Sequence, residues 1–141
     1  MRSLKKLKEN GRLAVDTNAV IAYREGVPEV CNIIEGAGTI LLPAIVLGEL
    51  LYGAGNSTRP QENGQAVRKF LTQSVLMPIN ENTAICYAAT RLKLKRAGRP
   101  IPENDIWIAA TCLEFDTPLL SRDAHFQHIH ELRVINWTKD K

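Results

Sequence analysis

Short apolar runs and longer segments of helical periodicity alternate along almost the whole chain. The expected strands lie over residues 13–16, 39–42, 75–79, 117–120 and 132–137. The expected helices lie over residues 28–35, 44–53, 61–73, 80–97 and 106–115, with a helical stretch from residue 19 and a short helical turn over 124–128. This alternation predicts an α/β fold of three layers, in which helices cover both faces of a central, mainly parallel sheet of about five strands.

Four acidic residues lie in four separate stretches, each near the end of a predicted strand. They are Asp16, Glu49, Asp105 and Asp123. In an open α/β sheet, the segments after the carboxyl ends of the strands converge on one crevice, so we expect these side chains to meet. Two bare carboxylates ~4 Å apart repel by roughly 4 kcal/mol at an effective dielectric constant near 20. A shared divalent cation removes that repulsion, which makes the four residues candidate metal ligands.

Each acidic residue also has an alternative explanation. Asp16, Asp105 and Asp123 each precede or open a helical segment, where Asp is a favoured N-cap. Glu49 is different, because its helix is apolar around most of its circumference and we expect the carboxylate to be buried. No Lys or Arg lies between residues 39 and 58, so a metal ion or a distant basic residue must partner it. A set of ligands made only of oxygen favours Mg²⁺ or Mn²⁺ over zinc or copper.

Four sequence motifs contain the acidic residues, and they occupy residues 14–18, 43–53, 102–110 and 121–126. These motifs resemble those of PIN-domain ribonucleases, and most closely the VapC-type toxins of type II toxin–antitoxin pairs. The resemblance extends from residue 13 to residue 137. It implies a single PIN-like nuclease domain over residues 13–141. Residues 1–12, which carry several Lys and Arg side chains, are then a basic N-terminal extension.

The resemblance also implies chemistry and partners. Asp16, Glu49, Asp105 and Asp123 are expected to bind Mg²⁺, with Mn²⁺ as a possible substitute, and to carry the cleavage of RNA phosphodiester bonds. Thr17, Asn18 and Ser121 match the polar residues that support those carboxylates. The expected partners are an RNA substrate, a second copy of the chain in a homodimer, and a cognate antitoxin that blocks the site. DNA is expected only through the antitoxin.

Composition and charge narrow these expectations without deciding them. The chain of 141 residues suits one domain, and its net charge of +3 permits binding to nucleic acid. No apolar run approaches the ~20 residues that span a bilayer, so we expect no membrane partner. Its three cysteines, Cys31, Cys86 and Cys112, lack the spacing of a zinc site or a disulfide framework. We interpret them as reduced core cysteines of a cytoplasmic protein.

The densest basic segment lies near the end of the longest predicted helix. It contains Arg91, Lys93, Lys95, Arg96 and Arg99. Such a segment is either a solvated helix face or a clamp for RNA phosphates. The nearby histidines, His125, His128 and His130, have no suitably spaced partner for zinc, so we expect surface or packing roles for them.

Two alternatives to a nuclease toxin remain open. In one, the chain is a catalytically quiet PIN-fold partner in a DNA-binding co-repressor complex with its antitoxin. In the other, it is a Mg²⁺-binding receiver-like module. A receiver-like module has an acidic pair after the first strand and a Lys after the last, whereas here Thr17 and Asn18 follow Asp16.

Overall fold

The structure is a computed structural model, and it describes residues 11–138. Five strands form one parallel sheet in the order β3-β2-β1-β4-β5. The strands are β1 (Arg12–Val15), β2 (Thr39–Pro43), β3 (Val75–Met77), β4 (Leu119–Leu120) and β5 (Val134–Ile135). The first ten residues of the expected basic extension lie outside the described residues, and Arg12 already belongs to β1.

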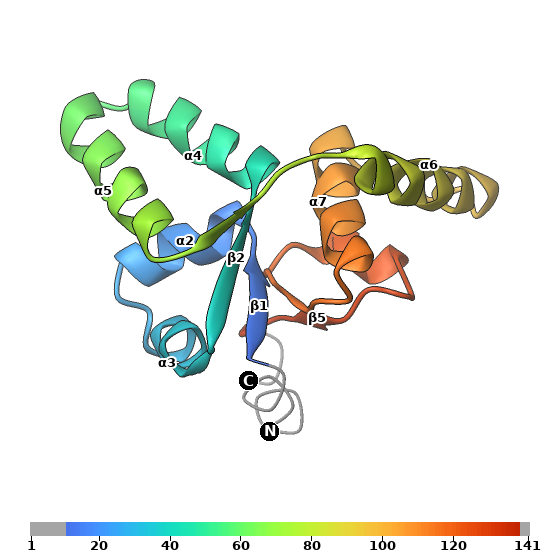
Figure 1. Ribbon diagram of the computed structural model, residues 1–141, viewed down its shortest axis with the longest axis horizontal. Helices are drawn as coiled ribbons and strands as arrows, with labels where there is room; N and C mark the ends of the chain where they lie inside the picture. The colour runs from blue at the N-terminus through green and yellow to red at the C-terminus, as the bar shows by residue number, and fades with distance from the viewer. Residues whose placement is uncertain (1–10, 139–141) are drawn as a thin grey trace.

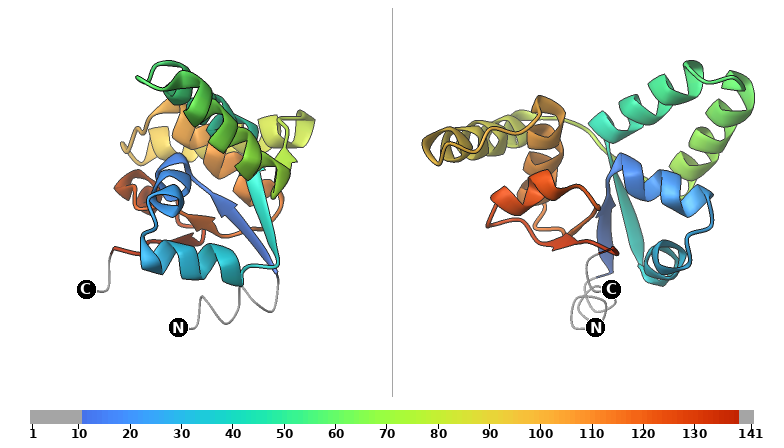
Figure 2. Two further views of the ribbon diagram at one scale, coloured as in Figure 1. Left: turned by 90° about the vertical axis from the view of Figure 1, so that its left-hand side faces the viewer. Right: turned by 180° about the vertical axis from the view of Figure 1, so that it is seen from behind.

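Helices cover both faces of the sheet, which confirms the predicted three-layer α/β/α fold (Figure 1). The helices are α2 (Thr17–Arg24), α3 (Pro28–Gly36), α4 (Ala44–Gly55), α5 (Pro60–Thr72), α6 (Glu81–Arg96), α7 (Glu103–Glu114) and the 3₁₀ helix η1 (Ala124–His128). Helices α2 and α3 lie on one side of β1 and β2, whereas α6 and α7 lie on the other. The view from behind shows the same separation (Figure 2).

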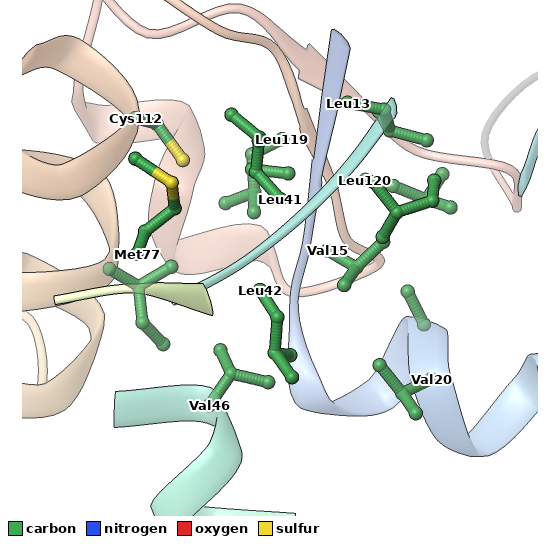
Figure 3. Packing of buried hydrophobic residues seen from close by; sticks show 14 of the residues in the cluster. Leu13, Val15, Val20, Leu41, Leu42, Val46, Met77, Cys112, Leu119 and Leu120 are labelled. Carbon is green, nitrogen blue, oxygen red and sulfur yellow. The ribbon is translucent and has the colours of Figure 1, made fainter. Parts of the chain in front are cut away.

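The sheet lies at the centre of the hydrophobic core. Successive strand residues point to opposite faces, so apolar side chains of the strands pack against the helices on both sides. In β4, Leu119 lies on the side of Cys112 in α7, and Leu120 lies on the side of Val20 in α2 (Figure 3). All four side chains are buried. Of the three cysteines only Cys112 is buried, so the prediction of core cysteines is correct for one of them.

The order of the strands determines where a site can form. The chain passes outward from β1 through β2 to β3, and then returns to the opposite side of β1 to form β4 and β5. The strand order therefore reverses between β1 and β4. In open parallel sheets, ligands bind at such a reversal, outside the carboxyl ends of the strands.

Most element boundaries follow local chemistry. Strand β3 ends at Met77 because Pro78 has no N–H for the ladder. Helix α6 begins after Asn80, which forms a reciprocal capping box with Thr83. Helix α7 begins at Glu103, earlier than expected, with Pro102 as its N-cap residue. Within residues 11–138, no helix is both long and apolar enough to cross a membrane.

Candidate metal centre

Asp16 is fixed at the carboxyl end of β1 by donors from three directions. Its Oδ1 accepts the backbone N–H of Thr17 at 2.8 Å, so the expected N-cap role in α2 is real. Its Oδ2 accepts the Ser121 hydroxyl at 2.7 Å and the Asn18 amide at 3.3 Å. Only 4% of Asp16 is exposed. Capping uses one carboxylate oxygen, and so Asp16 acts as a helix cap and also as part of a polar network.

Ser121 joins the end of β4 to this network. While its hydroxyl donates to Asp16, its oxygen accepts the backbone N–H of Asp123 at 3.0 Å. Asn18 completes the link, because its Oδ1 accepts the backbone N–H of Arg122 at 3.3 Å. The polar residues Asn18 and Ser121 therefore hold the ends of β1 and β4 together at the reversal of strand order.

Glu49 approaches from α4, the helix that follows β2. Its Oε1 accepts the Thr17 hydroxyl at 2.5 Å, and its Oε2 accepts the Asn104 amide at 3.2 Å. The expectation of a buried Glu49 is correct only in part, because the residue is half-buried and the neighbouring Leu51 and Tyr52 are exposed. Its partners among residues 11–138 are a hydroxyl and an amide, and no Lys or Arg of that range pairs with it.

Asp105 and Asp123 form the other side of the set, and His125 lies between them. Asp105 stands in the first turn of α7, and Asp123 is the N-cap of η1. His125 Nδ1 lies 3.0 Å from Asp105 Oδ2 and 3.0 Å from Asp123 Oδ1. One ligand atom from each of the three residues falls within 4.8 Å of the others. His125 lies at the surface, as expected, but it also contacts two of the four carboxylates, which the sequence did not predict.

The carboxylates influence one another's pKa. The pKa of Asp16 is raised from 3.8 to about 6, chiefly by burial. The hydrogen bonds from Ser121 and Thr17 act against this rise, and the charges of Asp105 and Glu49 add to it. Burial is also the main reason why the pKa of Asp105 is raised, and the charges of Asp123 and Glu49 act in the same direction.

The donor set fits a hard divalent cation. Within residues 11–138, none of the four carboxylates forms an ion pair with a Lys or an Arg. Carboxylate oxygens brought together without a cationic side chain are the ligands that Mg²⁺ and Mn²⁺ prefer. Asp16, Glu49, Asp105 and Asp123 therefore have the chemistry to hold such an ion. Of the four, Asp105 and Asp123 belong to the close group with His125, and Asp16 and Glu49 lie outside that group but near enough for their charges to act on Asp105 or on each other.

Residues that the sequence did not single out complete this region. Asn104 donates to Glu49, and the preceding Glu103 accepts both the Tyr87 hydroxyl and Arg91 Nη1. The Tyr87 ring stacks on Trp107, with the ring centres 3.9 Å apart. Asn104 lies beside Asp105 in the motif over residues 102–110, but its contact with Glu49 spans 55 positions and could not be predicted from the sequence.

The basic segment of α6 divides into paired and unpaired side chains. Arg91 pairs with Glu103, and Lys93 pairs with Glu131, each at 2.9 Å. Lys93 and Arg99 line a hollow of about 290 Å³, to which His128 and His130 also contribute. The following three side chains are exposed and form no ion pair in the described part of the chain: Lys95, Arg96 and Arg99.

Comparison with known families identifies this arrangement. The sequence profile of the PIN domain matches residues 13–132, which is most of the chain. The chain belongs to the PIN-domain family. Among relatives of this PIN domain, ribonuclease VapC1 of Haemophilus influenzae strain R2866 is 32% identical over 134 residues, covering 89% of this chain and 97% of that protein. The tRNA(fMet)-specific endonuclease VapC of Salmonella typhimurium strain LT2 is 26% identical, covering 89% and 98%.

Solved structures place this PIN domain beside VapC proteins in complexes. VapBC2 from Rickettsia felis, bound to a DNA fragment from its promoter, matches with a TM-score of 0.82 and 25% identity, covering 89% of this chain and 98% of that chain. VapBC-1 from nontypeable Haemophilus influenzae matches with a TM-score of 0.82 and 26% identity, covering 91% and 99%. The expected VapC-type PIN fold is thereby confirmed.

Proposed function

We propose that this chain is a Mg²⁺-dependent endoribonuclease that acts as the toxin of a toxin–antitoxin pair. The observation that carries the proposal is the set of four carboxylates at the reversal of strand order, none of them paired with a Lys or Arg in residues 11–138. Relatives named as VapC ribonucleases, which align over nearly the whole chain, support the same activity.

Asp16, Glu49, Asp105 and Asp123 would hold the Mg²⁺ ion, with Mn²⁺ as a substitute. A bound divalent ion lowers the pKa of coordinated water and neutralises the phosphate that is attacked. The protein supplies the orientation. Ser121 and Asn18 fix Asp16, and the Thr17 hydroxyl fixes Glu49, so the carboxylates need little rearrangement to act. A carboxylate of this set would accept the proton of the attacking water.

The RNA strand needs cations around this acidic region. Lys95, Arg96 and Arg99 are exposed, and they form no ion pair within the described residues. We assign them to the phosphate groups of RNA, because phosphate contacts position a strand and make its binding dependent on salt. Arg91 and Lys93 contribute less in this proposal, since each already neutralises a glutamate.

A cognate antitoxin and a second copy of the chain are the proposed protein partners in the cytoplasm. The similar VapBC structures support an antitoxin. Exposed apolar side chains support protein contacts as well, since Ile21, Leu51 and Tyr52 on α2 and α4 are 43%, 38% and 74% exposed. Coexpression with a small open reading frame found beside this gene, followed by size-exclusion chromatography with light scattering, tests both partners.

One observation favours a second function, that of a co-repressor in complex with the antitoxin. The similar Rickettsia felis complex is bound to DNA from its promoter. Operator binding by the purified complex, together with absence of cleavage by the free chain, would favour this function over the nuclease.

The direct test incubates purified protein with labelled RNA, with Mg²⁺ in one reaction and with EDTA in another. The proposal predicts internal cleavage with Mg²⁺ and none with EDTA. Cleavage that persists in EDTA, or no cleavage of total cellular RNA at any Mg²⁺ concentration, would contradict it. Acyl-phosphate formation on an aspartate would instead indicate a receiver-like module.

A further inference from the structure

The turn after β4 aims an imidazole nitrogen at two of the proposed metal ligands. Asp123 caps η1 by accepting the backbone N–H of His125 at 2.9 Å. Phe126 is fully buried and anchors the same turn in the core. The backbone around His125 is therefore fixed on both sides. The position of its ring beside Asp105 and Asp123 follows from the fold of the turn.

The distances match adjacent ligands of one ion. In an octahedral site with metal–ligand distances of about 2.1 Å, neighbouring ligand atoms are separated by about 3.0 Å, which is √2 times longer. His125 Nδ1 lies 3.0 Å from Asp105 Oδ2 and 3.0 Å from Asp123 Oδ1. We propose that His125 Nδ1 is itself a metal ligand, which joins Asp105 and Asp123 on one ion and makes the site prefer Mn²⁺ to Mg²⁺. This inference rests on the metal centre of the proposed function.

The preference follows from the chemistry of the donors. Mg²⁺ is a hard ion that binds oxygen and keeps its waters, whereas imidazole nitrogen suits the first-row transition metals. A site made of carboxylates alone separates Mg²⁺ from Mn²⁺ poorly. One nitrogen ligand strengthens the binding of Mn²⁺ and contributes little to Mg²⁺. His125 therefore changes which ion the site selects, while the four carboxylates supply the charge.

Pulsed electron paramagnetic resonance of the Mn²⁺-loaded protein tests the inference without any RNA. The expected spectrum contains the strong ¹⁴N coupling of a directly bound nitrogen, and labelling with [¹⁵N]histidine replaces it by ¹⁵N coupling. The His125→Ala variant is expected to lose the coupling. His130→Ala should retain it, because His130 is an exposed histidine outside the group of Asp105, Asp123 and His125. Absence of coupling in the unaltered protein, or its survival in His125→Ala, overturns the proposal and leaves His125 as a hydrogen-bond partner of the carboxylates.

Calorimetric titration measures the selectivity separately. His125→Ala is expected to weaken Mn²⁺ binding by about tenfold or more and to leave Mg²⁺ binding nearly unchanged. An equal loss for both ions contradicts the proposed preference. The outcomes also separate this inference from the nuclease proposal. RNA cleavage without nitrogen coupling rejects only the role of His125, and nitrogen coupling without cleavage by any ion rejects only the nuclease.

Discussion

The two sides of the carboxylate set are built differently. On one side Asp16 is buried, and its oxygens accept hydrogen bonds from Thr17, Asn18 and Ser121. On the other side the side chains of Asp105 and Asp123 are 13% and 30% exposed, and both contact His125.

The two sides therefore have different roles. The buried side orients a carboxylate, and the more exposed side allows an ion and a phosphate group to exchange. The buried side is held by neutral donors of the protein, which fix a carboxylate without neutralising its charge. The more open side has oxygens within reach of solvent, where an ion and a phosphate group can arrive and leave.

Removing one charge from either side should abolish cleavage. Asp16→Asn and Asp105→Asn each keep the shape of the side chain, and we expect RNA cleavage to fall on the order of 10² to 10⁴-fold. The matched control is Asp116→Asn, since Asp116 is an aspartate whose side chain is 94% exposed and contacts Arg133, away from the set. Full activity of either site variant in purified, folded form would refute the assignment.

Stability without metal should depend on pH through the buried side. The pKa of Asp16 rises from 3.8 to about 6 on folding, chiefly because of burial. Above pH 6 the folded protein therefore contains a poorly solvated carboxylate, a penalty of up to roughly 3 kcal/mol in the free energy of unfolding. Below about pH 4 Asp16 is protonated in both states and the penalty disappears.

Denaturation in EDTA at several pH values measures this effect. Asp16→Asn should be more stable than the unaltered chain at pH 7.5, and the difference should shrink as the pH falls through 6 toward 4. With saturating Mg²⁺ at pH 7.5, the unaltered chain should become more stable than Asp16→Asn, because only the unaltered chain retains the full ligand set. A stability difference that is independent of pH would show that burial does not govern Asp16.

Removing the hydrogen bond between Thr17 in α2 and Glu49 in α4 should reduce stability and cleavage less than the substitutions above. Thr17→Val removes the hydroxyl that donates to Glu49, and we expect a loss of about 1 kcal/mol in stability and on the order of tenfold in cleavage. Thr72→Val is the control, because its hydroxyl only bonds the backbone at the end of α5. Equal cleavage by the two variants would show that Thr17 does not orient Glu49.

The basic residues of α6 should affect binding more than chemistry. Replacing Lys95 and Arg96 together with Ala should weaken RNA binding and reduce its salt slope by roughly 1.4, the value for two phosphate contacts with a single strand. Replacing Arg68 and Lys69 removes the same charge from α5 and should leave the slope unchanged. If the two double substitutions change the salt slope equally, RNA binding depends on the net charge of the protein and not on the position of Lys95 and Arg96.

The fold was largely predictable because local patterns agree with it. Apolar runs located every strand, Gly38 and Pro43 marked the ends of β2, and Asn80 correctly marked the start of α6. The strands at one edge are shorter than expected, since β4 and β5 have only two paired residues each. Apolar residues that flank them, such as Leu132, are buried without joining the ladder.

The site was predictable only in part, because its details depend on contacts between distant segments. Asp16 and Asp123 follow the ends of β1 and β4, and Glu49 lies in the helix after β2. The expectation of a nearby strand end is wrong for Asp105, because α7 follows α6 and not a strand. The half-exposed environment of Glu49 could not be inferred, because the apolar face of α4 lies partly in solvent. His125 was missed because its partner Asp105 lies 20 positions away and belongs to another helix.

Anomalous X-ray diffraction from crystals grown with Mn²⁺ most directly tests whether these side chains share an ion. We predict a manganese peak bounded by the carboxylates of Asp16, Glu49, Asp105 and Asp123, and its loss in Asp105→Asn crystals grown alongside. A manganese-loaded crystal with no peak among these residues, or a peak unaffected by that substitution, would contradict the account.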